Sequence, residues 1–136
     1  MGCSYRSYAV VGVPFASLYE ERKQKKHVTK YNEDTGKPYQ QEVIEISFFW
    51  CGKEIEEECD YMEGFVKKMC GLEVYDAGSG NDGGTVGLCL AKPEPGDVQA
   101  IDGLTLSKAF LEVKEKLQKS GYNGNVQLYI ISYISC

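Results

Sequence analysis

Residues 72–90, LEVYDAGSGNDGGTVGLCL, decide the fold, because a glycine-rich loop separates two short apolar runs. The run before the loop (72–75) and the run after it (85–90) both have the composition of β-strands. Phosphate-binding loops of the Rossmann and P-loop types need a helix N-terminus directly after their glycines. We therefore predict a β-hairpin with a flexible turn. Anion or nucleotide binding by the backbone amides of the loop stays open as an alternative, because such a nest needs no helix.

Strands are also expected at the two ends of the chain. Residues 5–13 alternate loosely and are rich in small and β-branched side chains, as in an inner strand. Residues 125–135 are apolar on both faces, which is typical of a strand in the middle of a sheet. After the first strand, Pro14 opens either a short helix or an irregular excursion over 15–22.

A second hairpin is predicted in the first half of the chain. The stretch 32–38 is dense in turn-forming residues and separates strands at 28–31 and 39–50. The later strand alternates strongly, so we expect one of its faces to pack on the core. That inner face contains Ile44, Ile46, Phe48 and Trp50.

Two amphipathic helices complete the predicted set of elements. The first spans 54–70, with five carboxylates near its start, an apolar stripe along one face and Gly71 as its cap. The second spans 104–120, with Leu106, Phe110, Val113 and Leu117 inward and Gly121 as its cap. The order of elements predicts one α+β domain over 1–136, a mostly antiparallel sheet with two helices packed on one face.

Composition limits the classes of partner and the compartment. The formal net charge of −5 argues against nonspecific binding to nucleic acid or to an acidic membrane. No segment has the roughly 18 to 20 apolar residues that a membrane span needs. The six cysteines lack the spacing of a zinc site or a compact disulfide scaffold, so reduced thiols are expected. We expect a cytoplasmic protein, without a cofactor or a metal site.

Catalysis receives little support from the residues. A Cys–His pair would need His27, the only histidine, which lies in a charged stretch beside two lysines. The carboxylates at 56–60 are explained as the acidic start of a helix. Asp76 and Asp82 flank the glycine loop and are either solvated loop residues or metal ligands. Whether the protein is an enzyme stays uncertain, and the sequence favours a non-enzymatic role.

Ligand binding is supported better, because the chain has ten tyrosines, a basic run near 22–30 and the glycine loop. Aromatic faces would stack on a base, while lysines, arginine and backbone amides would hold phosphate. For Trp50, core packing is the alternative. Candidate phosphate contacts are Arg6, Lys30, Lys37 and Lys92, candidate stacking residues are Tyr5, Tyr8, Tyr31 and Trp50, and candidate loop contacts are Gly78, Ser79, Gly80 and Asn81.

Four short segments carry a resemblance to a family. They are Tyr8–Val13, Thr35–Pro38, the glycine-rich approach to Thr85–Gly87, and Leu128–Tyr133. Together they resemble small uncharacterised proteins of tailed bacteriophages, in which the turn at 35–38 often carries a zinc knuckle. Asn32 and Thr35 stand where the two cysteines of that knuckle would be, so the implied metal site is absent. The resemblance implies a phage accessory protein that antagonises host defence by binding something.

Three functions therefore remain in competition. The first is a non-enzymatic binding protein that sequesters a nucleotide-type signal, with a pocket lined by tyrosine and lysine and an oligomeric assembly. The second is a protein-interaction module that inhibits a host protein through an acidic surface at 54–60. The third is a small hydrolase or phosphodiesterase. A small anionic ligand or a host protein is accordingly the expected partner.

Overall fold

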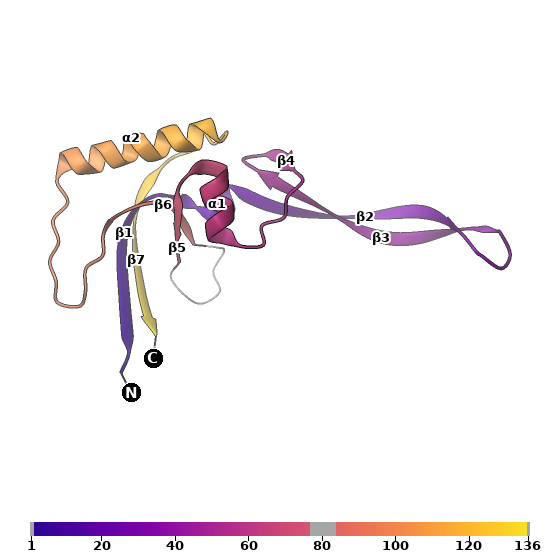
Figure 1. Cartoon of the computed structure of the whole chain (residues 1–136), viewed down its shortest axis with the longest axis horizontal. Helices are drawn as coiled ribbons and strands as arrows, with labels where there is room; N and C mark the ends of the chain where they lie inside the picture. The colour runs from indigo at the N-terminus through magenta and orange to yellow at the C-terminus, as the bar shows by residue number, and fades with distance from the viewer. Residues whose placement is uncertain (1, 77–83, 136) are drawn as a thin grey trace.

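The computed structural model describes residues 2–76 and 84–135 and contains strands, two α-helices and one short 3-10 helix (Figure 1). The predicted loop segment 77–83, which includes the candidate contacts at 78–81, lies outside the described residues. In chain order the elements are β1 (Ser4–Pro14), η1 (Phe15–Ser17), β2 (Tyr19–Tyr31), β3 (Pro38–Trp50), β4 (Lys53–Ile55), α1 (Met62–Cys70), β5 (Glu73–Tyr75), β6 (Thr85–Ala91), α2 (Gly103–Lys119) and β7 (Gln127–Ser135).

The described strands form two antiparallel sheets. One has the order β5-β6-β1-β7, and the other has the order β2-β3-β4. The predicted pairing of the strands that flank the glycine loop is confirmed, because β5 and β6 pair antiparallel. The expectation that the last strand lies in the middle is wrong, since β7 is an edge strand beside β1. β1 lies between β6 and β7, and in keeping with this central place five consecutive residues, 9–13, are all buried.

The core lies between the four-stranded sheet and the two helices, which confirms the expected α+β fold. In Figure 1, α2 crosses one side of the curved sheet, and α1 lies on β5. The helix faces predicted from periodicity point inward, because Val66 of α1 and Val113 and Leu117 of α2 are completely buried. They pack in one cluster with Val11, Val13 and Val86 of the sheet. Because one face of β1 and of β6 packs in this cluster, the other residues of both strands lie on the opposite face of the sheet.

A pair of glycines brings β1 and β6 into unusually close contact. Gly12 lies directly opposite Gly87 in the antiparallel register. A Cβ added at Gly12 would lie 2.0 Å from the carbonyl oxygen of Val86, and one added at Gly87 would lie 2.0 Å from that of Val11. No other residue fits either position, because both Cβ atoms would overlap backbone atoms of the neighbouring strand.

The second sheet is drawn out into a long projecting hairpin, which we call the arm (residues 20–47; Figure 1). β2 and β3 pair along 13 residues each, from Tyr19 opposite Trp50 to Tyr31 opposite Pro38. The hairpin at 32–38 is confirmed, but the first strand is much longer than predicted and includes 19–22. The excursion after Pro14 is therefore only the 3-10 turn η1.

The inner face predicted for the second strand is buried only at the base of the arm. Trp50 is 3% exposed, whereas Ile46 is 47% and Ile44 is 64% exposed. Aromatic contacts hold the base, because Phe65 of α1 packs edge-on against both Tyr19 and Trp50, with ring centroids 5.4 and 5.6 Å apart. Beyond the base the apolar alternation continues, and no other described part of the chain covers it.

The first helix is much shorter than predicted. Cys51 and Gly52 both have positive φ, as in a type I′ turn, and this turn folds β4 back onto β3. Residues 56–61 are not helical, and α1 begins only at Met62. A helix over 54–60 would have placed like charges one turn apart, at Glu54 and Glu58 for example, which destabilises it.

Two further observations concern the thiols and membranes. Cys51, Cys59, Cys70 and Cys89 are free thiols, whereas Cys3 is disulfide-bonded, so the expectation of reduced cysteines throughout is wrong at Cys3. Among the described residues, no helix has the length and apolar character that a membrane crossing requires.

Candidate functional site

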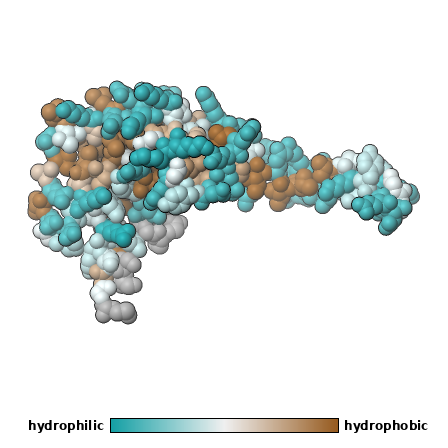
Figure 2. Space-filling view, in the orientation of Figure 1, coloured by the Kyte–Doolittle hydropathy of each residue, from teal (hydrophilic) through white to brown (hydrophobic). Residues whose placement is uncertain are grey.

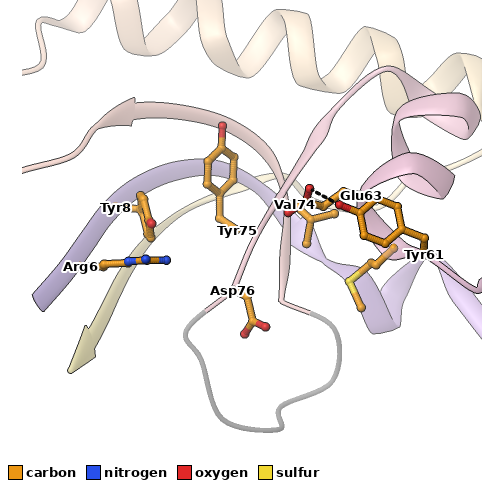
Figure 3. A pocket seen from close by; sticks show the side chains of 8 residues that line it. Arg6, Tyr8, Tyr61, Glu63, Val74, Tyr75 and Asp76 are labelled. Atoms are coloured by element: carbon orange, nitrogen blue, oxygen red, sulfur yellow. Dashed lines mark hydrogen bonds between the residues drawn. The ribbon is translucent and has the colours of Figure 1, made fainter. Parts of the chain in front are cut away.

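A hollow of about 360 Å³ lies beside the start of β1 (Figure 3). Side chains from three separated parts of the chain line it: the first half of β1, the start of α1 and the end of β5. We call it the tyrosine hollow, because three tyrosines surround it. Its lining residues are Arg6, Tyr8, Tyr61, Met62, Glu63, Val74, Tyr75 and Asp76.

Two of the tyrosines form the aromatic wall of the hollow. The rings of Tyr8 and Tyr75 lie 5.6 Å apart between centroids and are tilted by 49°. The hydroxyl of Tyr75 donates a hydrogen bond of 2.8 Å to Glu73 Oε2. Burial, and next this bond to Glu73, raise the pKa of Tyr75 well above its usual value. The hydroxyl is therefore protonated at neutral pH, and the bond to Glu73 and the contact with Tyr8 hold the side chain in place.

Charge in the tyrosine hollow is mixed. Arg6 is the only cation among its lining residues, and it forms no ion pair with another described residue. Figure 3 shows Arg6 and Tyr8 side by side and pointing toward Tyr75 and Asp76. Glu63 on the far wall accepts a hydrogen bond of 3.1 Å from the hydroxyl of Tyr61. One guanidinium beside aromatic rings can hold one anionic group of a ligand.

The structure brings together only part of the site predicted from the sequence. Arg6 and Tyr8 meet in the tyrosine hollow, two residues apart on one face of β1. Tyr5 borders a second hollow of about 310 Å³, between β1, the end of β7 and the loop at 93–97, and Arg6 lines this hollow as well. Lys92 precedes that loop, and its backbone N–H donates to Gln99 Oε1 at 3.1 Å.

Three other predicted contacts lie at the far end of the arm. Lys30 and Tyr31 end β2, and Lys37 belongs to the turn. Asn32 organises this turn, because its Oδ1 accepts hydrogen bonds from the backbone N–H groups of Asp34 and Thr35 at 2.8 and 3.2 Å. The arm separates this group from the tyrosine hollow, so the two cannot hold one small ligand within a single chain (Figure 1).

Trp50 belongs to the core, which confirms the alternative prediction of core packing for this residue. Its indole Nε1–H donates a hydrogen bond of 2.7 Å to Ser120 Oγ, which itself donates to the carbonyl oxygen of Met69 at 3.1 Å. This chain of bonds joins the base of the arm to the ends of both helices. Because the ring is buried, it offers no face to a ligand.

Sequence reasoning missed two of the tyrosines that line the hollow. Tyr75 was assigned only to a strand, although Val74 packs on the core and the alternation directs Tyr75 to the other side. That alternation could have marked Tyr75 as facing away from the core, but not as a neighbour of β1. Tyr61 is the N-cap residue of α1, whereas the helix predicted from the sequence begins at residue 54. The sequence pattern therefore gives no reason to select Tyr61.

The groups considered for catalysis do not converge in the described structure. His27 lies on the exposed arm opposite Glu42, whereas Cys51, Cys59 and Cys70 pack against the core. Burial raises the pKa of the Cys51 thiol to about 11. In the part of the chain that the structure describes, no group of three or more His, Cys, Asp or Glu side chains is placed to hold a metal ion.

Comparisons with known proteins give no further guide to the site. No family model, curated protein or solved structure matches the chain. The likeness to small phage proteins therefore stays a prediction from short segments.

Proposed function

We propose that this chain is a non-enzymatic binding protein that captures a small, anionic, aromatic ligand of nucleotide type in the tyrosine hollow. The observation that carries the proposal is the meeting of Arg6 with Tyr8 and Tyr75, which come from strands far apart in the sequence. Tyrosine rings offer an apolar face for a base, and the guanidinium offers paired donors to a phosphate.

The size of the hollow restricts the ligand. A volume of about 360 Å³ is near the lower end of the range for small-molecule sites. Among the described residues that line it, Arg6 is the one cation, and Glu63 and Asp76 add negative charge. A ligand with one phosphate group therefore fits better than a polyphosphate or a nucleic-acid strand.

The phage resemblance supplies a setting for this proposal. In that setting the captured ligand is a nucleotide signal of a host defence system, and the protein blunts the defence by lowering the free concentration of the signal. Sequestration needs binding without turnover, which is consistent with a site that combines aromatic rings and a guanidinium.

Native mass spectrometry tests the proposal. The protein is purified from its producing cells, measured directly, and then measured after incubation with a panel of cyclic and linear nucleotides. We expect a retained adduct of nucleotide mass that is released unchanged on denaturation. An altered nucleotide would instead promote the hydrolase alternative.

Matched variants test whether Arg6 holds the ligand. Arg6→Gln removes the positive charge and should weaken binding about tenfold or more, because charge-assisted hydrogen bonds are the strong ones. Lys92→Gln removes another exposed positive charge, outside both hollows, and should leave the affinity unchanged. Equal affinity of the Arg6→Gln variant and the unaltered protein would contradict the proposed site.

A second candidate function is inhibition of a host protein through the acidic segment 54–60. Ile55 and Cys59 pack against the core, and the backbone N–H of Cys59 donates to the Tyr19 hydroxyl at 3.2 Å. Glu56 and Glu58 are exposed on this anchored segment. A basic surface on a partner would be complementary to such a display of carboxylates.

Charge reversal tests the second candidate. Glu58→Lys should abolish capture of a host protein in a pull-down, whereas Glu115→Lys on the exposed side of α2 should not. Unchanged capture by the Glu58→Lys variant would count against an acidic interaction surface.

A further inference from the structure

An apolar stripe leaves the core and continues along the exposed arm. Trp50 is buried, Phe48 is half-buried, and Ile46 and Ile44 are exposed, all on one alternating face of β3. Figure 2 shows hydrophobic residues along the projecting arm. Exposed apolar surface that is continuous with a core is typical of an interaction surface.

The charges on the face of this stripe are mixed, because Glu21 lies opposite Phe48 and Glu42 is two residues before Ile44 in β3. The register places Lys25 opposite Ile44 and Lys23 opposite Ile46, so both lysines share the face of the stripe. Lys25 forms one exposed ion pair with Glu42 at 3.4 Å. Lys23 forms no ion pair with another described residue.

The base of the arm carries a groove with complementary character. Its volume is about 570 Å³, and it lies where β4 stops covering the edge of β3. Three of its lining side chains are apolar and three are carboxylates. The groove is lined by Glu45, Ile46, Ser47, Phe48, Glu54, Ile55 and Glu56.

We propose that two copies of this chain associate through their arms, which lie antiparallel and face to face. The Ile44–Ile46 stripe of each arm then enters the groove at the base of the other, and Lys23 and Lys25 of one copy approach Glu54 and Glu56 of the other. The proposal does not depend on the tyrosine hollow, whose residues lie outside the arm and the groove.

A second copy suits this surface because both complementary parts are on the same chain. An antiparallel arrangement brings the part of each arm that carries Ile44, Ile46 and the two lysines to the acidic, apolar groove of its partner twice, around a two-fold axis. Such an interface closes at two copies and leaves no unused half for further growth. It also stabilises a two-stranded ribbon that is only marginally stable when isolated in water.

Sedimentation equilibrium of the full chain in reducing buffer tests the proposal. We expect a concentration-dependent mass that approaches twice the 15.2 kDa of one chain. The double variant Ile44→Glu, Ile46→Glu should weaken association about 100-fold or more, because it places charge in the apolar contact. Each new glutamate lies opposite a lysine of β2, which preserves the hairpin. Leu111→Glu, at an equally exposed leucine of α2, should leave association unchanged.

Charge exchange tests the orientation of the two arms. The double variant Lys23→Glu, Lys25→Glu should weaken association about tenfold. Adding Glu54→Lys and Glu56→Lys to the same chain should restore it, since the attractive pairs are rebuilt with opposite signs. Failure of the four substitutions together to restore association would overturn the antiparallel arrangement.

Crosslinking reports the contact directly. A carbodiimide links lysine to carboxylate, and a mixture of ¹⁴N- and ¹⁵N-labelled protein separates links between copies from links within one copy. We expect mixed-isotope links between 23–25 and 54–56. A chain that stays monomeric at all concentrations, a dimer that survives the isoleucine substitutions, or open-ended filaments would each overturn the proposal.

Discussion

The body and the arm each contain a long strand with many apolar residues, but these residues are buried in the body and exposed in the arm. In β1, every residue from Ala9 to Val13 is buried, because the sheet continues on both sides and the helices cover one face. In β3, Ile44 and Ile46 share a face with the buried Trp50 but stay exposed, because no other described segment of the chain covers the arm. Alternation thus predicts a strand and its faces, whereas burial depends on what the rest of the molecule places against them.

Energetically, the two regions are held by different interactions. The body is stabilised by completely buried side chains such as Leu72, Val86 and Leu117. The arm is held by its ladder of backbone hydrogen bonds, by exposed ion pairs such as Lys26–Glu45, and by the Arg22 guanidinium 4.0 Å from the centre of the Phe49 ring. Exposed ion pairs contribute little, about 0 to 1 kcal/mol each. Substitutions in the body should therefore have much larger effects than substitutions in the arm.

The largest effect is expected at the glycine pair of the body. Gly12→Ala and Gly87→Ala should each lower the free energy of unfolding by about 3 kcal/mol or more, because the new Cβ overlaps backbone of the neighbouring strand. Chemical denaturation monitored by circular dichroism measures this change.

Gly103→Ala is the matched control for the glycine pair. A Cβ at Gly103 meets no other atom within 4 Å, and the residue is the first of α2. We expect unchanged or slightly raised stability for this variant. Comparable losses at Gly103 and Gly12 would show that the close approach of β1 and β6 is not the cause.

An intermediate effect is expected where the arm joins the body. Ser120→Ala removes the acceptor of the 2.7 Å hydrogen bond from the buried Trp50 indole. It should lower the free energy of unfolding by about 1 to 3 kcal/mol, because the indole N–H stays buried without a partner. Ser107→Ala, at an exposed serine of α2, is the control and should change stability very little.

A double-mutant cycle sharpens this second prediction. In a Trp50→Phe background the donor is already absent, so Ser120→Ala should have a clearly smaller effect than it has alone. Additive effects of the two substitutions would mean that Ser120 stabilises the protein in another way, such as through its 3.1 Å bond to the Met69 carbonyl.

The smallest effect is expected when the outer arm is removed. Replacing residues 23–46 by an Asn-Gly turn joins Arg22 to Ser47, which lie opposite each other in the register. The thermal midpoint of the body should change by less than about 3 °C at low protein concentration, because the deleted residues contribute nothing to the core. A chain that no longer folds after this deletion would contradict the division into body and arm.

Much of the fold could be predicted from local patterns. The strands on both sides of the glycine loop, the hairpin turn at 32–38 and the second helix follow from turn-forming residues and from periodicity, and all are confirmed. The predicted first helix is too long. Its helical apolar spacing includes Ile55 and Cys59, but these residues lie in β4 and in the irregular segment before α1. The two-residue turn at Cys51 and Gly52 reverses the chain at this point. The sequence does not indicate this turn, because cysteine rarely adopts a positive φ.

The candidate site was only partly predictable. Arg6 and Tyr8 were selected as residue types that suit an anionic aromatic ligand, and they do line the same hollow. Tyr75 and Tyr61 come from β5 and α1, and no spacing in the sequence shows that these elements lie beside the start of β1. Conversely, Trp50 has the right chemistry for stacking but lies in the core.

The sequence by itself determined the class of fold, the positions of most strands and the inward face of α2, because these depend on residues close together in the chain. Only the tertiary structure decided that β1 is central and β7 an edge, that a tyrosine hollow forms, and that half of an alternating strand stays uncovered. The physical reason is that alternation specifies which side chains share a face, whereas burial and proximity depend on contacts between segments far apart in the chain.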